Sequence, residues 1–432
     1  MNTLVWFRND LRVEDNNSLW QACQQKGTVL AVYFFDPRHY ALSEFGFKKT
    51  ECYRAQFLIE TVTDLQQQLA QRNITLLTFL GKPEDHLSEL VEKHDIEAIY
   101  LQKEWTRDEQ QVLKAAQNSV GTKVTFHETY DQFLFHPTDI PYASFDEIPE
   151  VFTTFRKRCE KLAKIHPPKA APNPRPEAHR IANPTQLPKL SDLGLDHFTK
   201  DARTAFPFKG GATAGRERIQ HYFWDTQKLA HYKKTRNGLI GQDYSSKLSA
   251  WLANGSLSPR TIYAEVKRFE KTITKNQDTY WLVFELIWRD YFKYVSLKHG
   301  PSIFALGGIL NRSYHWGTDA RHTQVWINGA TQEPFVNANM IELQKTGWMS
   351  NRGRQNVASF WAKELQQDWR IGAAYFESML IDYDVHSNWG NWMYNSGVGN
   401  DPRDRKFNIK GQAERYDPKG HFQKQWLQEV LF

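Results

Sequence analysis

Tryptophans and polar side chains are concentrated between Gly347 and Asn408, near the end of the chain. An ordinary core is built from Leu, Ile and Val, and it holds a large ring with a polar tip only where the ring N–H finds a partner. Flat rings beside paired carboxylates and arginines suit a large planar ligand that forms hydrogen bonds, either a heteroaromatic cofactor or nucleobases. The region therefore predicts a ligand site, although its arginines and carboxylates could equally form a structural network. Besides five tryptophans it contains Arg352, Arg354, Asp382, Asp384, Asn388 and Asn391.

A serine-rich segment at 241–260, GQDYSSKLSAWLANGSLSPR, is a second candidate. It places Ser245, Ser246 and Ser249 around the expected start of a helix. Hydroxyls and unpaired N–H groups at a helix start can hold a pyrophosphate, and Lys247 would add positive charge. The alternative is that a serine merely caps the helix, which is the commoner role of one isolated residue of this kind.

Glu285 and Arg289 lie four residues apart in WLVFELIWRDYF. On a solvent-exposed helix such a pair contributes only about 0.3 kcal/mol. Trp288 lies between them among apolar residues, however, and a carboxylate in an apolar helix is costly unless it has a partner. The pattern therefore favours a functional site over a surface ion pair.

Composition sets the class of protein. The chain has 432 residues, of which 24% are charged and 40% hydrophobic, as in soluble globular proteins. No apolar run approaches the roughly 18–20 residues of a membrane span, and MNTLVWFRND opens in a strand pattern without a signal-type stretch, which predicts a cytoplasmic protein. Cys23, Cys52 and Cys159 are widely spaced and near no histidine, so we expect reduced thiols and no metal site.

The positive charge lies in the second half of the chain. Residues 1–200 carry 24 Lys and Arg against 27 Asp and Glu, whereas residues 201–432 carry 31 against 22. Twelve of the 15 tryptophans also lie there, from Trp224 onward. A basic, aromatic-rich half suits nucleic-acid binding, although charge alone also fits mere solubility. Trp316, Trp369 and Trp392, taken singly, could be core residues.

The first ~130 residues alternate buried strands with helical patterns. A helix between them carries the apolar stripe Leu58, Val62, Leu65 and Leu69. This predicts a doubly wound, Rossmann-like α/β domain with a parallel sheet. It lacks the standard GxGxxG dinucleotide fingerprint and has FRNDLR after its first strand. The expected strands are 3–7, 28–35, 74–80, 97–101 and 123–127.

A proline-rich stretch separates this domain from a second one. The segment 166–188 holds seven prolines, which predicts an extended linker along the surface. Beyond Phe206 the pattern is helical almost to the end, including a helix at 278–298, so the second domain is expected to be all-α. The predicted divisions are an α/β domain at 1–132, a linker at 133–205 and a helical ligand-binding domain at 206–432.

In order and in residue type, the chain resembles the photolyase/cryptochrome flavoproteins from WFRNDLR to WLQEVLF. TRNGLIGQDYSSKLS, NWGNWMY and GVGNDPRDRKFNI are most similar to the cryptochrome DASH subgroup. The resemblance implies one FAD bound non-covalently by the helical domain, and a folate antenna, 5,10-methenyltetrahydrofolate, near the α/β domain. Glu104, after the strand 97–101, is the candidate antenna contact, but acidic residues also commonly open helices.

The resemblance also assigns roles to individual residues. Asn388 would face flavin N5, where an asparagine accompanies photolyase-type use of fully reduced FAD and plant signalling cryptochromes carry an aspartate. The FAD contacts that it implies are Tyr232, Ser245, Ser246, Lys247, Leu248, Ser249, Glu285, Arg289, Arg354, Asp382, Asp384 and Asn388. The electron-transfer chain that it implies is Trp392, Trp369 and Trp316. The DNA or lesion contacts that it implies are Glu285, Trp288, Asn351, Arg352, Gln355 and Tyr394.

Three of these positions narrow the substrate. Asn351 and Gln355 stand where (6-4) photolyases have a histidine pair, which argues against (6-4) repair. Tyr394 replaces a tryptophan, and Gln355 a methionine, of the conventional cyclobutane-dimer photolyases. A smaller, more polar clamp recovers less of the few kcal/mol that extrusion from a duplex costs. The resemblance thus predicts a monomeric blue-light enzyme that splits cyclobutane pyrimidine dimers, preferentially in single-stranded DNA, by electron transfer from excited FADH⁻.

Two other classes remain open. A signalling photoreceptor would use the same flavin and tryptophans, but the chain ends at Phe432 with no added tail, which places this class second. A regulatory DNA- or RNA-binding protein without catalysis would also fit the basic half. Loss of dimers under blue light would separate repair from both classes.

Overall fold

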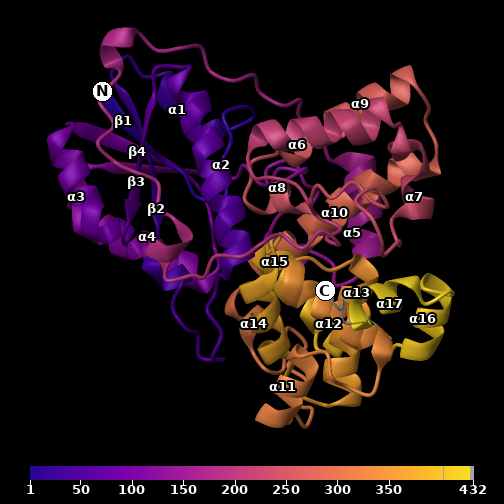
Figure 1. The fold of residues 1–432 in the computed structure, drawn as a ribbon. Helices are drawn as coiled ribbons and strands as arrows, with labels where there is room; N and C mark the ends of the chain where they lie inside the picture. Colours follow the sequence, from indigo (N-terminus) through magenta and orange to yellow (C-terminus); the bar gives the residue numbers. More distant parts are fainter. Residues whose placement is uncertain (402, 429–432) are drawn as a thin grey trace.

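The computed structural model describes residues 1–401 and 403–428 of the chain. Figure 1 shows an N-terminal unit built around a sheet beside a larger unit built of helices. The predicted combination of an α/β unit and a helical unit is therefore confirmed.

The N-terminal sheet has five parallel strands in the order β3-β2-β1-β4-β5. The chain crosses to the opposite side of β1 after β3, which is the topology of a doubly wound sheet. The last strand begins at Thr125, two residues later than predicted, because residues 121–123 form a 3-10 turn after the preceding helix. The strands are β1 Asn2–Trp6, β2 Val29–Phe35, β3 Thr75–Leu80, β4 Ile96–Gln102 and β5 Thr125–Thr129.

Helices cover both faces of this sheet. Leu19 and Leu65 of α1 and α2 pack with Val5 on one face, whereas Leu87 and Leu113 of α3 and α4 belong to the core of the other face. In the predicted apolar stripe of α2, three leucine and valine side chains are buried and Leu58 is partly buried. The helices are α1 Asn17–Cys23, α2 Cys52–Ala70, α3 Pro83–Lys93 and α4 Arg107–Val120.

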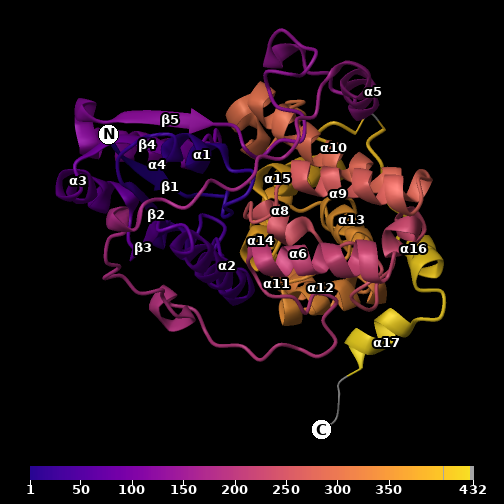
Figure 2. The same cartoon turned by 90° about the horizontal axis from the view of Figure 1, so that it is seen from above.

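The chain then passes to the helical unit and returns along the sheet unit. The backbone N–H groups of Leu134 and Phe135 donate to the Asp290 carboxylate at 2.9 and 2.8 Å, and α5, Phe152–Leu162, packs in the helical core. The proline-rich stretch 166–188 runs extended along the surface of the α/β unit, as predicted, and Figure 2 shows its path. Arg175 in this stretch donates to backbone carbonyls that follow α1.

The rest of the described chain is mainly helical and contains two apolar clusters. The long α10 crosses the first cluster, and its Asn276 side chain caps the N–H groups of the first turn. The helices are α6 Ala212–Ile219, α7 Tyr232–Thr235, α8 Ser249–Ala253, α9 Pro259–Thr272, α10 Gln277–His299, α11 Ala320–Ile327, α12 Pro334–Thr346, α13 Asn351–Ser359, α14 Trp369–Met379, α15 Val385–Ser396, α16 Ile409–Tyr416 and α17 His421–Leu427.

Buried charges join the two units. Arg260 at the start of α9 pairs with Asp15 at 2.8 Å, and Arg12 donates to the Gly255 carbonyl at 2.8 Å. Truncating one partner of such a buried pair costs about 3–5 kcal/mol, so these contacts fix the orientation of the helical unit. None of the described helices is long and apolar enough to cross a membrane.

Candidate functional site

Glu285 lies on α10 and is paired by a residue that the sequence did not indicate. Its carboxylate meets the Arg236 guanidinium, just after α7, at 2.9 Å. The interpretation of Glu285 and Arg289 as a surface ion pair is therefore wrong. Arg289 donates to the carbonyls of Gln132 and Leu252 and thereby ties α10 to two backbone segments. Burial raises the pKa of Glu285, while the Arg236 charge partly offsets this effect.

Arg354 and Asp382 form an ion pair with bifurcated hydrogen bonds. The same guanidinium nitrogen lies 2.8 and 3.0 Å from the two carboxylate oxygens, and Arg354 Nε donates to the Met349 carbonyl. The Asp382 side chain is only 3% exposed, whereas 27% of the Arg354 side chain remains exposed. The Asp382 carboxylate is therefore buried, and part of the Arg354 guanidinium remains at the protein surface.

Asp384 combines a buried ion pair with a helix cap. One carboxylate oxygen meets the Lys293 ammonium at 2.8 Å, and the other accepts the Ser387 N–H at the start of α15. Burial opposes ionisation of Asp384, but Lys293 and the neighbouring charges together outweigh it and hold the pKa of Asp384 well below its usual value. Burial in turn lowers the pKa of Lys293 to about 8. One turn along α15, Asn388 donates to the Ala373 carbonyl at 3.0 Å.

Arg218 holds the backbone of the serine segment in place. This buried guanidinium donates to the carbonyls of Ser245 and Ser246 at 3.0 Å each. The short α8 begins at Ser249, but its capping position is Leu248 and no side chain caps it. A plain serine cap, the alternative to a phosphate-binding role, is thus not the arrangement found.

Lys247 adopts a left-handed backbone conformation with φ of 62° and turns its side chain inward. Its ammonium lies 3.3 Å from the Tyr244 ring centroid and 4.7 Å from that of Trp348, and no described residue accepts a hydrogen bond from it. Burial lowers its pKa, and the nearby Glu342 carboxyl opposes that shift. Any contact of Lys247 with a ligand in the serine segment is therefore expected from its backbone.

Tyr232 links the serine segment to Glu285. Its buried hydroxyl faces Arg236 and Ser246, and burial raises its pKa to about 12. Through Arg236 the polar contacts continue to Glu285. Tyr232 on α7, Ser246 before α8 and Glu285 on α10 therefore belong to one connected group, although Tyr232 and Glu285 are 53 residues apart in sequence.

These side chains fit FAD by their chemistry. Asn388 uses its amide N–H group internally, and no described residue donates to its Oδ1, which leaves an acceptor for a ring N–H. The hydroxyls of Ser245 and Ser249 make no hydrogen bond within the described chain and can donate to a phosphate. Arg354, although paired with Asp382, keeps a partly exposed guanidinium that can hydrogen-bond the ring system.

Trp288, one turn after Glu285 on α10, meets Tyr394 edge to face. Their ring centroids are 6.3 Å apart at 87°, and Trp288 stacks on Phe152 at 3.6 Å. Arg405 donates to the Tyr394 hydroxyl at 2.6 Å and fixes that ring. Two half-buried aromatic rings with a basic neighbour suit a pair of bases.

Arg352 is the basic residue of α13 on this side. It donates to Asn237 and to Gln355, both at 2.9 Å, and lies over the Tyr416 ring. Asn351 begins the same helix and is exposed. The predicted lesion contacts on α13 are thus available at the surface.

Contacts with the backbone bring together the three segments that carry the predicted relay tryptophans. Gly372 lies one turn after Trp369 in α14, and any Cβ there would collide with the Trp392 ring. Asp368, the residue before Trp369, donates its N–H to the Gly317 carbonyl at 2.8 Å, next to Trp316. Trp392 and Trp369 are both buried, whereas Trp316 is half-buried, so of the three only Trp316, the predicted outermost member, is partly exposed.

Glu104 follows β4 as predicted, and its carboxylate has several internal partners. Arg8 pairs with it at 3.1 Å, and Asn9 and Gln102 donate to it at 2.9 and 3.2 Å. Together with burial, its charge raises the pKa of Glu109 to about 7. Glu104 therefore anchors the loop that follows β1 through Arg8 and Asn9.

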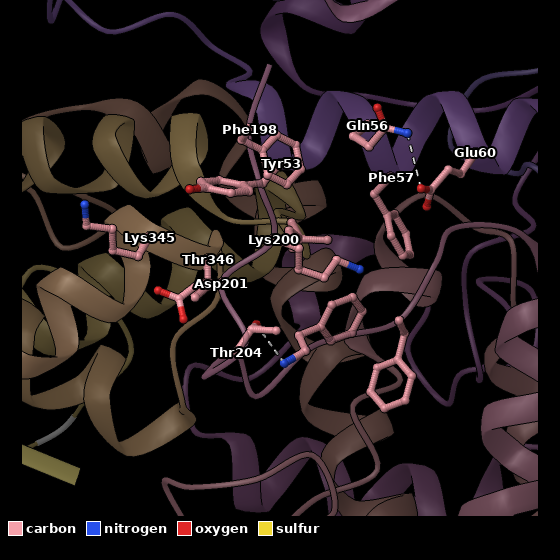
Figure 3. Close-up of a pocket in the computed structure, with 13 residues that line it drawn as sticks. Tyr53, Gln56, Phe57, Glu60, Phe198, Lys200, Asp201, Thr204, Lys345 and Thr346 are labelled. Carbon is pink, nitrogen blue, oxygen red and sulfur yellow. Dashed lines mark hydrogen bonds between the residues drawn. The ribbon is translucent and has the colours of Figure 1, made fainter. Parts of the chain in front are cut away.

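A separate small pocket lies between α2, residues 198–208 and the end of α12 (Figure 3). Tyr53 and Phe198 line the pocket with ring centroids 4.6 Å apart, and Figure 3 shows the Glu60 carboxylate and the Lys200 amine among the other lining groups. None of the predicted site residues lines this pocket, so it is no part of the group described above.

Comparison with known proteins places these features in a family context. Residues 3–176 match the model of the DNA photolyase family, and residues 281–431 match the FAD binding domain of DNA photolyase. Cryptochrome DASH of Gloeobacter violaceus is 47% identical over 99% of this chain and 85% of that protein. Cryptochrome DASH of Natronomonas pharaonis is 45% identical over 99% and 90%. The crystal structure of a Synechocystis sp. PCC6803 cryptochrome has a TM-score of 0.95 at 44% identity, covering 99% of this chain and 89% of that one.

Proposed function

Because the chain belongs to the photolyase/cryptochrome family and groups with cryptochrome DASH proteins, we propose that it is a blue-light-dependent enzyme that repairs cyclobutane pyrimidine dimers, preferentially in single-stranded DNA. The observation that carries this proposal is that Glu285 lies one turn before Trp288 on α10 and is joined through Arg236 to the polar group that suits FAD. A carboxyl group there can reach a base while staying close to the cofactor.

The C-terminal half contains an FAD-binding domain, and its own residues provide the holding contacts. We assign the phosphates to the serine segment held by Arg218, and the ring system to Arg354, Asp382 and Asn388. When bound and fully reduced, FAD supplies one electron to the dimer under blue light and accepts it back. The protein's part is to position the two partners and to exclude water.

Glu285 stabilises the charge that develops on the damaged base. It can hydrogen-bond a pyrimidine carbonyl, and an added electron increases the negative charge on that oxygen. Because burial raises the pKa of Glu285, the protonated, hydrogen-donating form becomes easier to populate than for an exposed glutamate. Arg236 holds the carboxyl group in place from the other side.

The single-strand preference rests on Tyr394. Its ring is smaller than an indole, and its hydroxyl is bound by Arg405, so it stacks less surface on an extruded base pair. Extrusion from a duplex costs a few kcal/mol that a single strand does not require.

We further propose that a folate antenna contacts Glu104. We expect Glu104→Gln to lose a near-ultraviolet absorber and to retain its flavin.

The test is purification in the dark, followed by an absorption spectrum and repair assays on matched single-stranded and duplex substrates. Flavin absorption with light-dependent repair that is faster on the single strand supports the proposal. Equal rates on both substrates would overturn the strand preference, and protein that remains colourless after supplementation with FAD would overturn the cofactor assignment.

A blue-light photoreceptor is the second candidate. It is favoured by the partial exposure of Trp316 beside the buried Trp369 and Trp392, because a relay to the surface serves photoreduction and is not needed once flavin is reduced. A light-dependent change in partner binding without dimer repair is the result that would favour this function.

A further inference from the structure

Tyr314 lies beside the outermost relay tryptophan. Its ring contacts that of Trp316 at 5.7 Å between centroids and 73° between planes, in an edge-to-face pair. Tyr314 is 36% exposed, whereas Trp316 is half-buried. The contact therefore extends the series of aromatic rings by one step toward solvent.

The Tyr314 hydroxyl has a base in hydrogen-bond contact. It donates to Asp404 Oδ2 at 2.8 Å and accepts from Arg312 at 3.3 Å. A proton acceptor within roughly 2.6–3.2 Å is the geometry that proton transfer requires. Burial opposes ionisation of Asp404, but hydrogen bonds from Lys363 and Tyr314 outweigh it and lower the pKa of Asp404, so the acceptor is a carboxylate at neutral pH.

Asp404 belongs to the motif GVGNDPRDRKFNI. The proposed repair site uses few residues of this motif. Gly397 has φ of 81°, and a side chain there would collide with the Asp404 carboxylate. Arg312 donates to the Gly397 carbonyl at 2.8 Å, and Lys363 pairs with Asp404. Two cations and a glycine thus hold the carboxylate under the tyrosine hydroxyl.

Trp316 has no such acceptor. Its indole Nε1 is buried and makes no hydrogen bond within residues 1–401 and 403–428. An oxidised indole that cannot release its proton to a protein base remains a strong oxidant. The adjacent phenol, in contrast, can lose its electron and its proton together.

We propose that Tyr314 is the terminal redox residue of the relay and that Asp404 is its proton acceptor. One electron passes from Tyr314 to the Trp316 radical cation, and the phenol proton passes to the Asp404 carboxylate. The products are a neutral tyrosyl radical, a restored Trp316 and a protonated Asp404. The electron vacancy on Trp316 originates from photoexcited oxidised flavin, so this inference rests on the relay of the proposed function.

The test is flash photolysis of the FAD-loaded, oxidised protein, with radicals identified by transient absorption and electron paramagnetic resonance. The wild type should end on a neutral tyrosyl radical, formed more slowly in D2O. Tyr314→Phe should lose that signal and retain a tryptophan radical that recombines faster. Asp404→Asn keeps an acceptor oxygen but cannot take the proton, so it should also lose the tyrosyl signal. Tyr263→Phe, on α9, is the matched control and should retain it.

Two results would overturn the inference: a wild-type protein that ends on a tryptophan radical, or a tyrosyl signal that survives in Tyr314→Phe. Trp316→Phe separates this step from the relay, because it should abolish both late radicals. Absence of every aromatic radical in the wild type would contradict the relay and the inference together. Dimer repair by chemically reduced protein needs no relay and therefore tests the proposed function independently.

Discussion

The carboxylate of Glu285 and the guanidinium of Arg236 meet at 2.9 Å and join α10 to the residue that follows α7. Through Tyr232 the same arginine approaches the serine segment. The residue proposed to touch the lesion is thus mechanically connected to the residues proposed to hold the FAD phosphates.

Replacing Glu285 should impair repair without releasing the cofactor. Glu285→Ala removes the hydrogen bond to the base, and we expect a loss of about tenfold in repair rate, or ~1.4 kcal/mol. Glu285→Gln should keep part of the activity because the amide still donates a hydrogen bond. The measurement is dimer loss per absorbed photon at equal flavin content. Wild-type yield in the alanine variant would remove Glu285 from the lesion site.

Replacing Arg354 should weaken flavin retention. The chain offers a matched control, since Arg370 pairs with Asp368 at the same 2.8 Å and with a similar exposure of 28% against 27%. Arg354→Ala should raise the FAD dissociation constant about tenfold or more, because loss of one charged hydrogen bond costs about 1.5–3 kcal/mol. Arg370→Ala should leave it unchanged. Equal retention in both variants would show that the Arg354 pair is structural.

Replacing Trp392 should interrupt photoreduction. Trp392→Phe should abolish most blue-light reduction of oxidised FAD, retain bound flavin and repair normally when the flavin is reduced chemically. Trp326 is the control, because it is also buried and lies 6.2 Å from Trp392 but outside the proposed relay. Trp326→Phe should photoreduce at the wild-type rate. If Trp326→Phe abolishes photoreduction and Trp392→Phe does not, the relay runs through Trp326 and the assignment of Trp392 is wrong.

Glu342 should make stability depend on pH. Burial, opposed by Lys247 and Arg354, raises its pKa from 4.5 to about 8. Between these values the folded state holds a proton that the unfolded chain releases, so this contribution to stability is complete below pH 4.5 and is lost as the pH rises to about 8. Glu342→Gln should therefore gain about 1–3 kcal/mol relative to wild type between about pH 5.5 and 7.5.

Urea unfolding at these two pH values measures the effect, with Glu333→Gln at the start of the same helix as the control. The difference between Glu342→Gln and wild type should increase with pH. A difference that is constant, or that decreases with pH, would contradict the protonated, buried state of Glu342.

Most of the fold could be predicted from the periodic alternation of apolar and polar side chains. The buried strands, the stripe at Val62, Leu65 and Leu69, and the helix containing Glu285 all follow from side-chain alternation, which local sequence expresses directly. The last strand was misplaced by two residues because the short turn at 121–123 leaves no periodic signal.

The partners of the site residues could not be predicted in the same way. Arg236 is 49 residues from Glu285, and Arg218 acts through backbone carbonyls that no side-chain pattern reveals. Lys247 shows the opposite difficulty: its charge suggested a phosphate contact, but its left-handed backbone turns the ammonium inward. Long-range pairing and backbone conformation, rather than residue type, decided these cases.

The most direct test of the account is a single-turnover count of cyclobutane dimers in a single-stranded oligonucleotide, using dark-purified protein with its flavin fully reduced. We predict that dimers disappear under blue light and persist in the dark, with intact pyrimidines recovered in equal amount. Unchanged dimers after illumination, in a sample shown to contain reduced FAD and bound oligonucleotide, would contradict repair as the function of this protein.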